Sequence, residues 1–380
     1  RPSMTKAAEL AKMGEVLTNG QIGGRRNIVI NGAMNVAQRS ASVTGIGASA
    51  GYFTCDRWKA EIGSTAGRFT MSQTADGPNG ISANCLKLDC TTADTSIAAA
   101  EYLFLATNFE GQDLQGIGKG LTGAKEVTVS FYVKANAAFD FVVEFHDRDN
   151  SRSNGRIFAT TTDWVRHEIT FQADVDDGSS PFDDDNAASA RLNFWLHAGA
   201  TYTGGTLASS WENITQANRA AGIDSFFSST DNNFFITGVQ MEVGSVATPF
   251  EHRSFGEELQ LCRRYFWAMV PEGEATGAAG DTGQYVMGSG YYLGTGQIEL
   301  PLVFNQEMRA TPTLEVSSGT NHFVIEAAGG NDYFNTWTIF GAKKQSALLY
   351  GTSNVSGTAG QSGRVVAAST SSYVYWSAEL

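Results

Sequence analysis

The stretch EVTVSFYVK, from Glu126 to Lys134, alternates apolar and polar side chains with a period of two. One side of the run is apolar and consists of Val127, Val129, Phe131 and Val133. This spacing predicts a β-strand with one face in a core. Residues 139–146 repeat the pattern, and further strand patterns lie at 164–171, 192–197 and 234–241. So many short strands in one region favour two packed sheets, an all-β jelly-roll or β-sandwich domain.

The composition agrees with a turn-rich β protein. Only 17% of the 380 residues are charged, whereas 42 are glycine. The net charge of −13 and the absence of a basic stripe argue against nucleic-acid binding. No apolar run reaches the roughly 18 residues of a membrane span, so we expect no membrane insertion.

Changes of pattern along the chain predict four segments. Residues 1–24 form an N-terminal helical stub, with a helix at 5–17 and a hinge, and we expect Met4 to be the natural start. Residues 25–253 form the jelly-roll domain. Residues 254–283 form a linking helix, at 254–267, and a loop. Residues 284–380 form a second, smaller β-sandwich, with strands at 285–293, 297–303, 313–316, 323–327, 337–340, 364–368 and 373–377.

Two motifs lie at the ends of the predicted jelly roll. The first is NIVINGAMNVAQR at residues 27–39, followed by Asp56, Arg57 and Trp58. The second is VQMEVGSVATPFE at residues 239–251. This pair resembles tail fibre and tailspike-like proteins of bacteriophages and prophages, and MRATPT at 308–313 resembles the start of a strand in their distal β domain.

The resemblance implies a receptor-binding protein of the virion tail, made in the cytoplasm of a bacterial host. Its expected partners are a host cell-surface polysaccharide, two further copies in a homotrimer, and other virion tail proteins. The apolar stripe of the helix at 5–17 also needs a partner. Two other functions stay open, namely a structural tail or baseplate adaptor that binds no glycan and a glycan depolymerase.

The first and last strands of a jelly roll commonly lie side by side, so we expect the two motifs to meet at one edge. Two interpretations are then possible for the polar residues near this junction, which are Gln38, Arg39, Asp56, Arg57 and Trp58. In the first, they form a polar binding site with Trp58 as a platform. In the second, they hold a buried Arg-carboxylate pair beside a core tryptophan.

No catalytic motif occurs in the sequence, neither a G-x-S-x-G elbow, nor HExxH, nor a phosphate loop with its lysine. We therefore expect no enzyme activity. Cys55, Cys85, Cys90 and Cys262 form no CxxC pair and are expected to be reduced and mostly buried.

Glycan binding requires aromatic rings beside polar side chains. The candidates are Trp195, His197, Tyr202 and Trp211 in the first β domain and Tyr333 and Trp337 in the second. Trp195 and His197 fall on the side of their strand opposite Leu192, Phe194 and Leu196. Each ring could instead cover a hydrophobic edge or a subunit interface.

The negative charge is concentrated between Asp140 and Ala190, a stretch that contains twelve acidic residues but only four arginines. The loop at 174–186 offers oxygen ligands of the kind that Ca²⁺ prefers, and the candidate ligands are Asp174, Asp176, Asp183 and Asp185. The loop does not have EF-hand spacing, and a solvated acidic loop is the alternative.

Overall fold

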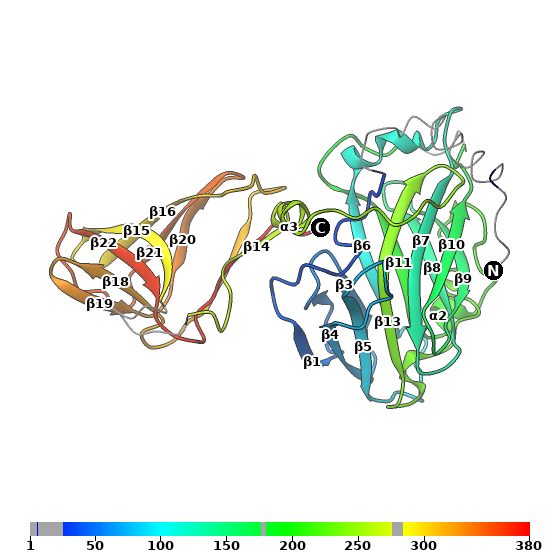
Figure 1. Ribbon diagram of the computed structural model, residues 1–380, viewed down its shortest axis with the longest axis horizontal. Helices are drawn as coiled ribbons and strands as arrows, with labels where there is room; N and C mark the ends of the chain where they lie inside the picture. Colours follow the sequence, from blue (N-terminus) through cyan, green and yellow to red (C-terminus); the bar gives the residue numbers. More distant parts are fainter. Residues whose placement is uncertain (1–5, 7–25, 176–179, 276–283) are drawn as a thin grey trace. The chain divides into compact units, whose positions relative to one another are not determined.

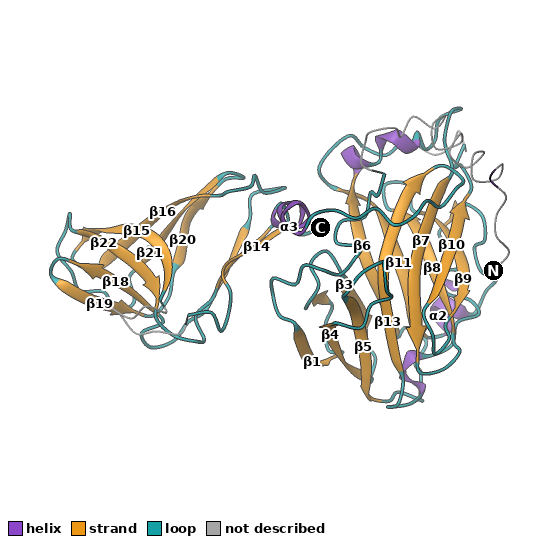
Figure 2. Ribbon diagram, viewed as in Figure 1, coloured by secondary structure: helices purple, strands orange, loops and turns teal. Residues whose placement is uncertain are grey.

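The computed structural model describes residue 6 and residues 26–175, 180–275 and 284–380. The remainder of the helix predicted at 5–17 and the hinge after it lie outside the described residues. The chain divides into two compact units, one ending at Phe255 and also holding Leu380, the other formed by Gly256–Glu379. Strands dominate both units (Figures 1 and 2), as the alternating patterns predict.

The first unit is a jelly-roll β-sandwich of two antiparallel sheets. The first sheet has the order β1 (Ser42–Ile46), β4 (Arg68–Thr74), β5 (Cys85–Thr92), β13 (Asn233–Val243), β7 (Val127–Ala135) and β10 (Val165–Phe171). The second has the order β12 (Glu212–Asn213), β9 (Arg152–Ala159), β8 (Asp140–Asp147), β11 (Ala188–Ala198), β6 (Tyr102–Glu110), β3 (Lys59–Gly63) and β2 (Gly51–Tyr52). The short helices of this unit are η1 (Gly111–Asp113), η2 (Gln115–Ile117), α2 (Ala200–Thr203), η3 (Gln216–Asn218) and η4 (Phe226–Ser228).

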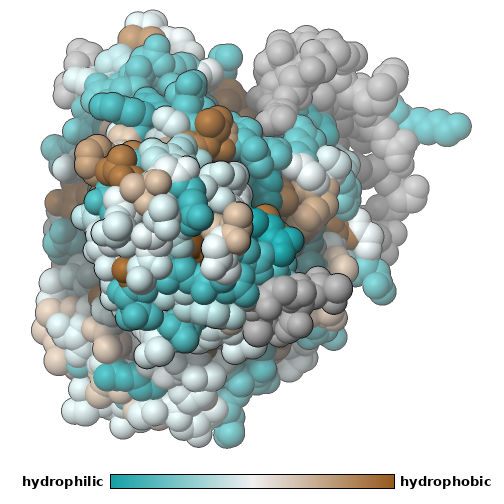
Figure 3. Space-filling view, turned by 90° about the vertical axis from the view of Figure 1, so that its left-hand side faces the viewer, coloured by the Kyte–Doolittle hydropathy of each residue, from teal (hydrophilic) through white to brown (hydrophobic). Residues whose placement is uncertain are grey.

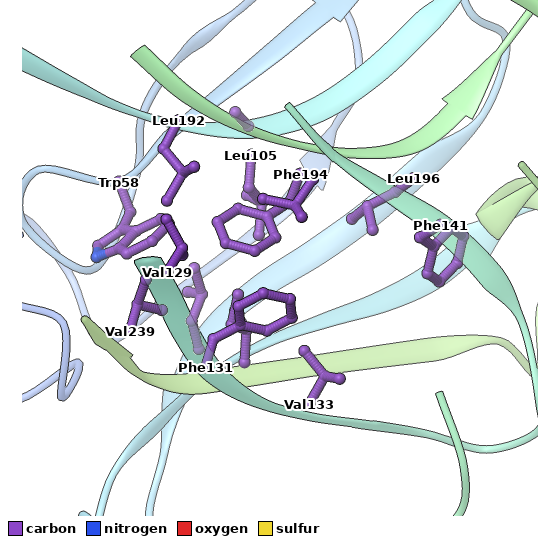
Figure 4. Packing of buried hydrophobic residues seen from close by; sticks show 14 of the residues in the cluster. Trp58, Leu105, Val129, Phe131, Val133, Phe141, Leu192, Phe194, Leu196 and Val239 are labelled. Carbon is purple, nitrogen blue, oxygen red and sulfur yellow. The ribbon is translucent and has the colours of Figure 1, made fainter. Parts of the chain in front are cut away.

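The core lies between the two sheets. β7 contributes the apolar side chains predicted from its alternation, and β11 contributes Leu192, Phe194 and Leu196 from the opposite sheet (Figure 4). The rings of Phe131 and Phe194 meet edge to face, with 5.1 Å between their centres. The period-two pattern therefore identifies the core of this domain correctly.

The outer face of the second sheet is buried as well. Trp195 and Val142 point away from the main core and pack with Tyr202, Leu207 and Ala220 in a separate cluster. The chain between β11 and η4 supplies the last three residues and covers this face. Consequently β8, whose second side reads as polar, is buried on both faces for most of its length.

The two end motifs lie together, which confirms that part of the prediction. Asn27 Oδ1 accepts hydrogen bonds from the backbone N–H groups of Val29 and Met241, both at 3.0 Å. The backbone N–H of Ile28 donates to the carbonyl of Met241 at 2.9 Å. They do not meet at an edge, however, because β13 lies between β5 and β7 inside the first sheet.

The polar residues of the first motif are structural, and the binding-site interpretation is wrong. Trp58 is 0% exposed, and its Nε1 donates to the backbone oxygen of Asn31 at 3.1 Å. Asp56 is also buried and accepts from the backbone N–H of Gln38 at 2.9 Å. Arg57 is buried, and its guanidinium donates to the carbonyl of Asn108 at 2.7 Å.

The second unit is a smaller pair of antiparallel sheets preceded by α3 (Phe255–Arg263). The three-stranded sheet has the order β14 (Phe266–Val270), β23 (Val374–Ser377) and β17 (Thr313–Val316). The seven-stranded sheet has the order β19 (Gly330–Phe334), β18 (Phe323–Ala327), β22 (Ser362–Ala367), β15 (Tyr285–Gly294), β16 (Gln297–Val303), β21 (Ser346–Gly351) and β20 (Thr338–Ala342).

The boundary of the second unit differs from the prediction. The helix ends at Arg263, and Phe266 begins β14, which pairs with β23 near the C-terminus. Residues 266–270 thus belong to the second unit and not to a linker. The apolar residues of β14 fit a strand and a helix equally well, and only the distant partner strand decides between the two.

Candidate functional site

The structure buries Trp195, so the prediction that its ring faces a ligand is wrong. The ring is 0% exposed and lies 4.4 Å from the ring of Phe104, centre to centre. Its Nε1 donates to Glu144 Oε2 at 2.8 Å. The chain between β11 and η4 covers this face of the sheet, and the partly exposed ring of Tyr202, 5.4 Å from that of Trp195, is part of the cover.

The prediction for His197 is also wrong, but for a different reason. The register shifts between Trp195 and His197, and the imidazole packs on Phe227 of the main core, with 5.1 Å between ring centres. This side chain is 0% exposed, and its Nδ1 lies 2.8 Å from Ser225 Oγ. Trp211 is half-buried, with its Nε1 donating to the carbonyl of Gln172 at 2.8 Å and its ring packed on Phe145.

In the second unit, Trp337 is 2% exposed and packs edge to face on Phe334, with 4.8 Å between ring centres. Its assignment to a ligand site is therefore wrong as well. Tyr333, on β19, is partly exposed, and its role in binding stays a prediction. Four of the six predicted residues lie in the first unit and two in the second.

The acidic loop also differs from the predicted calcium site. Asp174 is buried and receives a bidentate pair of hydrogen bonds from Arg152, at 2.9 and 3.1 Å. Lys119 Nζ lies 3.5 Å from the same carboxylate. Since these cations occupy Asp174, it is not an open calcium ligand. Asp176 lies outside the described residues, and Asp183 and Asp185 are exposed, so calcium binding there stays a prediction.

The outer face of the first sheet carries an aromatic surface that the sequence interpretation missed. Phe235 on β13 is paired in register with Lys87 on β5 and with Lys134 on β7. Trp164 immediately precedes β10, whose first residue, Val165, is paired with Val133. One row of side chains therefore crosses β5, β13, β7 and the start of β10. Cations and rings alternate along it, in the order Lys87, Phe235, Lys134 and Trp164.

The distances within this row show close cation-ring packing. Lys134 Nζ lies 4.8 Å from the centre of the Phe235 ring and 5.2 Å from that of Trp164. Lys87 Nζ lies 5.5 Å from the Phe235 ring on its other side. All four side chains are half-buried, so each presents part of its surface to solvent.

Tyr132, two residues from Lys134 on the same side of β7, extends the surface into a second row. Its register partners are Thr237 on β13 and Arg166 on β10, and the Arg166 guanidinium lies 6.0 Å from the ring.

Gly238 lies beside Tyr132 with a φ of +61°, and a Cβ at this position would lie 2.8 Å from Ile81 and 2.9 Å from the tyrosine ring. Glycine thus allows the loop at 75–84 to approach the aromatic surface. We call Lys87, Tyr132, Lys134, Trp164 and Phe235 the aromatic face.

Each cation on this surface has a carboxylate partner. Lys134 Nζ lies 2.7 Å from Asp76, and Lys87 Nζ lies 3.2 Å from Asp89. Arg166 is paired with Glu168. The three pairs consequently offer hydrogen-bond donors and acceptors to a ligand, and their charges cancel.

A shallow hollow adjoins the surface. The loop at 75–84, Asn35 and His252 line it, and it exposes the side chains of Asn79, Ser82 and His252. The backbone carbonyl of Asp76, in the same loop, accepts from Trp164 Nε1 at 3.1 Å. The hollow thus supplies amide and hydroxyl groups beside the rings.

Large hydrophobic side chains are also exposed elsewhere among the described residues, for example Ile97, Leu121 and Ile157 in the first unit. On the face that Figure 3 shows, hydrophobic side chains form small patches separated by hydrophilic residues. Among the described residues, no helix is long and apolar enough to cross a membrane.

One signal in the sequence points to the aromatic face. The alternation of EVTVSFYVK places Tyr132 on the polar side of the strand, two residues from Lys134. Phe235 gives no such signal, because it follows Phe234 and either ring could face the core. The register with β5 and β7 resolves this, since Phe234 is 0% exposed and Phe235 points outward.

Comparison with known proteins gives structural likeness alone. No protein-family model matches the sequence, and no curated protein matches it either. Similar solved structures include a CBM4 structure, with 11% identity and a TM-score of 0.28, covering 56% of this chain and 97% of the other. A family 11 carbohydrate-binding module from Clostridium thermocellum has 12% identity and a TM-score of 0.26, covering 50% and 91%. The CBM22-1 xylan-binding domain from Paenibacillus barcinonensis has 11% identity and a TM-score of 0.26, covering 59% and 100%. Scores this low carry no conclusion about what this chain binds.

Proposed function

We propose that this chain is a non-catalytic glycan-binding protein and that the aromatic face is its contact surface. The observation that carries the proposal is the row in which Lys134 lies between the rings of Phe235 and Trp164. Sugar C–H surfaces stack on such rings, while sugar hydroxyls exchange hydrogen bonds with neighbouring polar side chains. The rings and the polar groups occur here together, on neighbouring strands and on the loop at 75–84.

The charges favour a neutral sugar. Because Lys87, Lys134 and Arg166 are each paired with a carboxylate, an anionic sugar would have to compete with Asp89, Asp76 and Glu168. The whole chain, at −13, gives an anionic ligand no long-range attraction. A neutral hexose unit can instead accept hydrogen bonds from the lysines and donate to the carboxylates.

The wider role that we propose is host attachment by a bacteriophage or prophage tail fibre. The resemblance of the motifs at 27–39 and 239–251 supports this role. The receptor is then a polysaccharide of the host cell surface, and the protein is a homotrimer joined to other tail proteins. Three copies of a weak sugar site that reach one surface together gain avidity without any new contact.

The test is binding of labelled full-length protein to a glycan array and to host cells, with the variant Trp164→Ala/Phe235→Ala. We expect the double variant to lose binding while its melting temperature stays close to that of the wild type, because both rings are half-buried at the surface. The matched control is Phe340→Ala, which removes a ring that is 72% exposed in the second unit, and it should bind like the wild type.

Four outcomes would contradict the proposal or one part of it. Loss of binding in Phe340→Ala alone would move the site to the second unit. A wild-type protein that binds neither glycans nor cells would favour the structural adaptor, and shortening of the host polysaccharide on incubation would favour a depolymerase. A monomer by light scattering would exclude the trimer.

A further inference from the structure

Three side chains that can bind a metal ion meet inside the first unit, away from the aromatic face. Asp94 and Glu101 lie in the connection between β5 and β6, and His197 lies near the end of β11, so two separate segments contribute. Each residue offers one ligand atom, and these atoms all lie within 4.8 Å of one another. The side chains are deeply buried, with Asp94 5%, Glu101 6% and His197 0% exposed.

Two of these ligand atoms have no hydrogen-bond partner. They are Glu101 Oε2 and His197 Nε2, which lie 3.6 Å apart. Buried polar atoms are almost always hydrogen-bonded, because water cannot compensate for a missing partner. Two unpartnered atoms that point at one another across a buried cluster therefore suggest that a further group lies between them.

The surrounding contacts hold the ligand atoms in place. His197 Nδ1 lies 2.8 Å from Ser225 Oγ, and Ser225 also caps η4 by accepting from the backbone N–H of Phe227 at 3.2 Å. A proton on Nδ1, donated to Ser225, leaves the lone pair of Nε2 directed at the carboxylates. The backbone N–H of Asp94 donates to the carbonyl of Phe227 at 2.8 Å, so η4 positions two of the three ligands.

Asp94 is positioned from its other side as well. Its Oδ2 accepts from Thr65 Oγ1 at 2.9 Å and from the backbone N–H of Ala66 at 2.8 Å. Ligating carboxylates in metal sites are typically hydrogen-bonded in this way.

We propose that Asp94, Glu101 and His197 bind a divalent transition-metal ion, with zinc as the best-fitting ion. Two ligands of a tetrahedral zinc ion at ordinary bond lengths lie about 3.3 Å apart, close to the separation of Glu101 Oε2 and His197 Nε2. Two carboxylates and a neutral imidazole carry two negative charges, which a divalent ion balances. The imidazole nitrogen favours zinc-like ions over calcium and magnesium, which prefer oxygen ligands alone.

Burial disfavours the charged forms of both side chains, so it lowers the pKa of the His197 imidazole and, together with the neighbouring Asp94, raises the pKa of the Glu101 carboxyl. Because the ligands come from two segments that are distant in the sequence, the bound ion joins the chain between β5 and β6 to β11 and stabilises the fold.

The experiment uses the full chain after dialysis against chelator. Titration with ZnCl₂, followed by calorimetry and thermal unfolding, should give one ion per chain and raise the melting temperature by about 5 to 10 °C at a hundredfold excess over Kd. CoCl₂ should give the visible absorption bands of a four-coordinate site. These two measurements need no variant.

The variants Glu101→Gln and His197→Gln should each weaken zinc binding at least tenfold and lose the cobalt bands. His167→Gln replaces a half-buried histidine on β10 and serves as the matched control, with unchanged binding. Less than 0.1 zinc ion per chain with an unchanged melting temperature would overturn the proposal. So would binding of CaCl₂ without binding of ZnCl₂, or a folded His197→Gln protein that binds zinc like the wild type.

Discussion

Lys134 on β7 lies directly beside Phe235 on β13, with its ammonium nitrogen 4.8 Å from the centre of the ring. The same nitrogen lies 2.7 Å from Asp76 in the loop that borders the hollow. A single lysine thus joins the ring row to the polar loop. This position makes Lys134 the side chain that should donate to a sugar hydroxyl while the ring beside it carries the stacking.

We expect Lys134→Met to weaken glycan binding by about ten- to a hundredfold, because one charge-assisted hydrogen bond contributes roughly 1.5 to 3 kcal/mol. Stability should change by less than about 1 kcal/mol, since the Asp76 partner is 55% exposed and exposed ion pairs contribute little. Calorimetry with the glycan that the array identifies measures the first effect, and urea unfolding measures the second. Lys125→Met, which removes an exposed lysine just before β7, is the control, and wild-type affinity in Lys134→Met would exclude the lysine from the site.

The two tryptophans Trp195 and Trp164 should respond to truncation in opposite ways. Trp195→Ala removes a fully buried ring together with the Nε1 donor of Glu144, so we expect a loss of about 3 to 5 kcal/mol in the free energy of unfolding. Trp164→Ala should cost about 1 kcal/mol or less and should affect glycan binding instead. Urea unfolding followed by circular dichroism distinguishes the two, and equal losses would show that the aromatic face is part of the folding core.

The main core could be predicted from the sequence because the alternation on β7 needs only local information. The prediction that Trp195 lies opposite Leu192, Phe194 and Leu196 is also confirmed. The same prediction for His197 is wrong, because the register shifts between Trp195 and His197 and the imidazole packs on Phe227 of the main core. The burial of these two residues could not be predicted. Trp195 is covered by the chain between β11 and η4, which folds over the outer face of the second sheet and has no periodic pattern of its own. His197 is covered by Phe227 of η4.

Long-range partners explain the other differences. Asp174 in the acidic loop resembles a cation ligand until Arg152 and Lys119 are placed beside it. Glu144 on β8 has the spacing of a solvent-facing residue, and only Arg219, 75 residues further along the chain, makes its burial possible. A sequence pattern of a few residues contains no information on such pairs.

The close approach of the two end motifs gives a prediction at Gly32. The backbone N–H of Val239 donates to the carbonyl of Gly32 at 2.9 Å, and a Cβ on Gly32 would lie 2.0 Å from the carbonyl oxygen of Val239. Gly32→Ala should therefore push the N-terminal segment away from β13 and cost about 2 kcal/mol or more. Thermal unfolding is the measurement. Gly116→Ala, where a Cβ meets no atom within 4 Å, is the control, and equal melting temperatures of the two variants would contradict the pairing.

The pH dependence of stability should depend strongly on Glu144. Both of its oxygens accept hydrogen bonds from Arg219, at 2.8 and 2.9 Å, and Asn193 and Trp195 donate to Oε2. Burial opposes ionisation of this carboxyl, but the charge of Arg219 outweighs it and lowers the pKa of Glu144 to about 2. His146 beside it is held neutral, because burial lowers the pKa of the imidazole to about 3.

Both shifts make the unfolded chain bind more protons than the folded chain in acid, so stability falls as the pH falls. The contribution of Glu144 is complete above pH 4.5 and is lost as the pH falls from there to 2. A pKa shift of this size corresponds to about 3 kcal/mol.

Glu144→Gln should lower the free energy of unfolding by about 3 kcal/mol at pH 7, because it leaves Arg219 unpaired. Between pH 5 and 2, the unfolding free energy of this variant should then decline less steeply than that of the wild type. Urea unfolding at a series of pH values measures both, with the exposed Glu168→Gln as the control. Parallel pH curves for Glu144→Gln and the wild type would show that the acid sensitivity arises elsewhere.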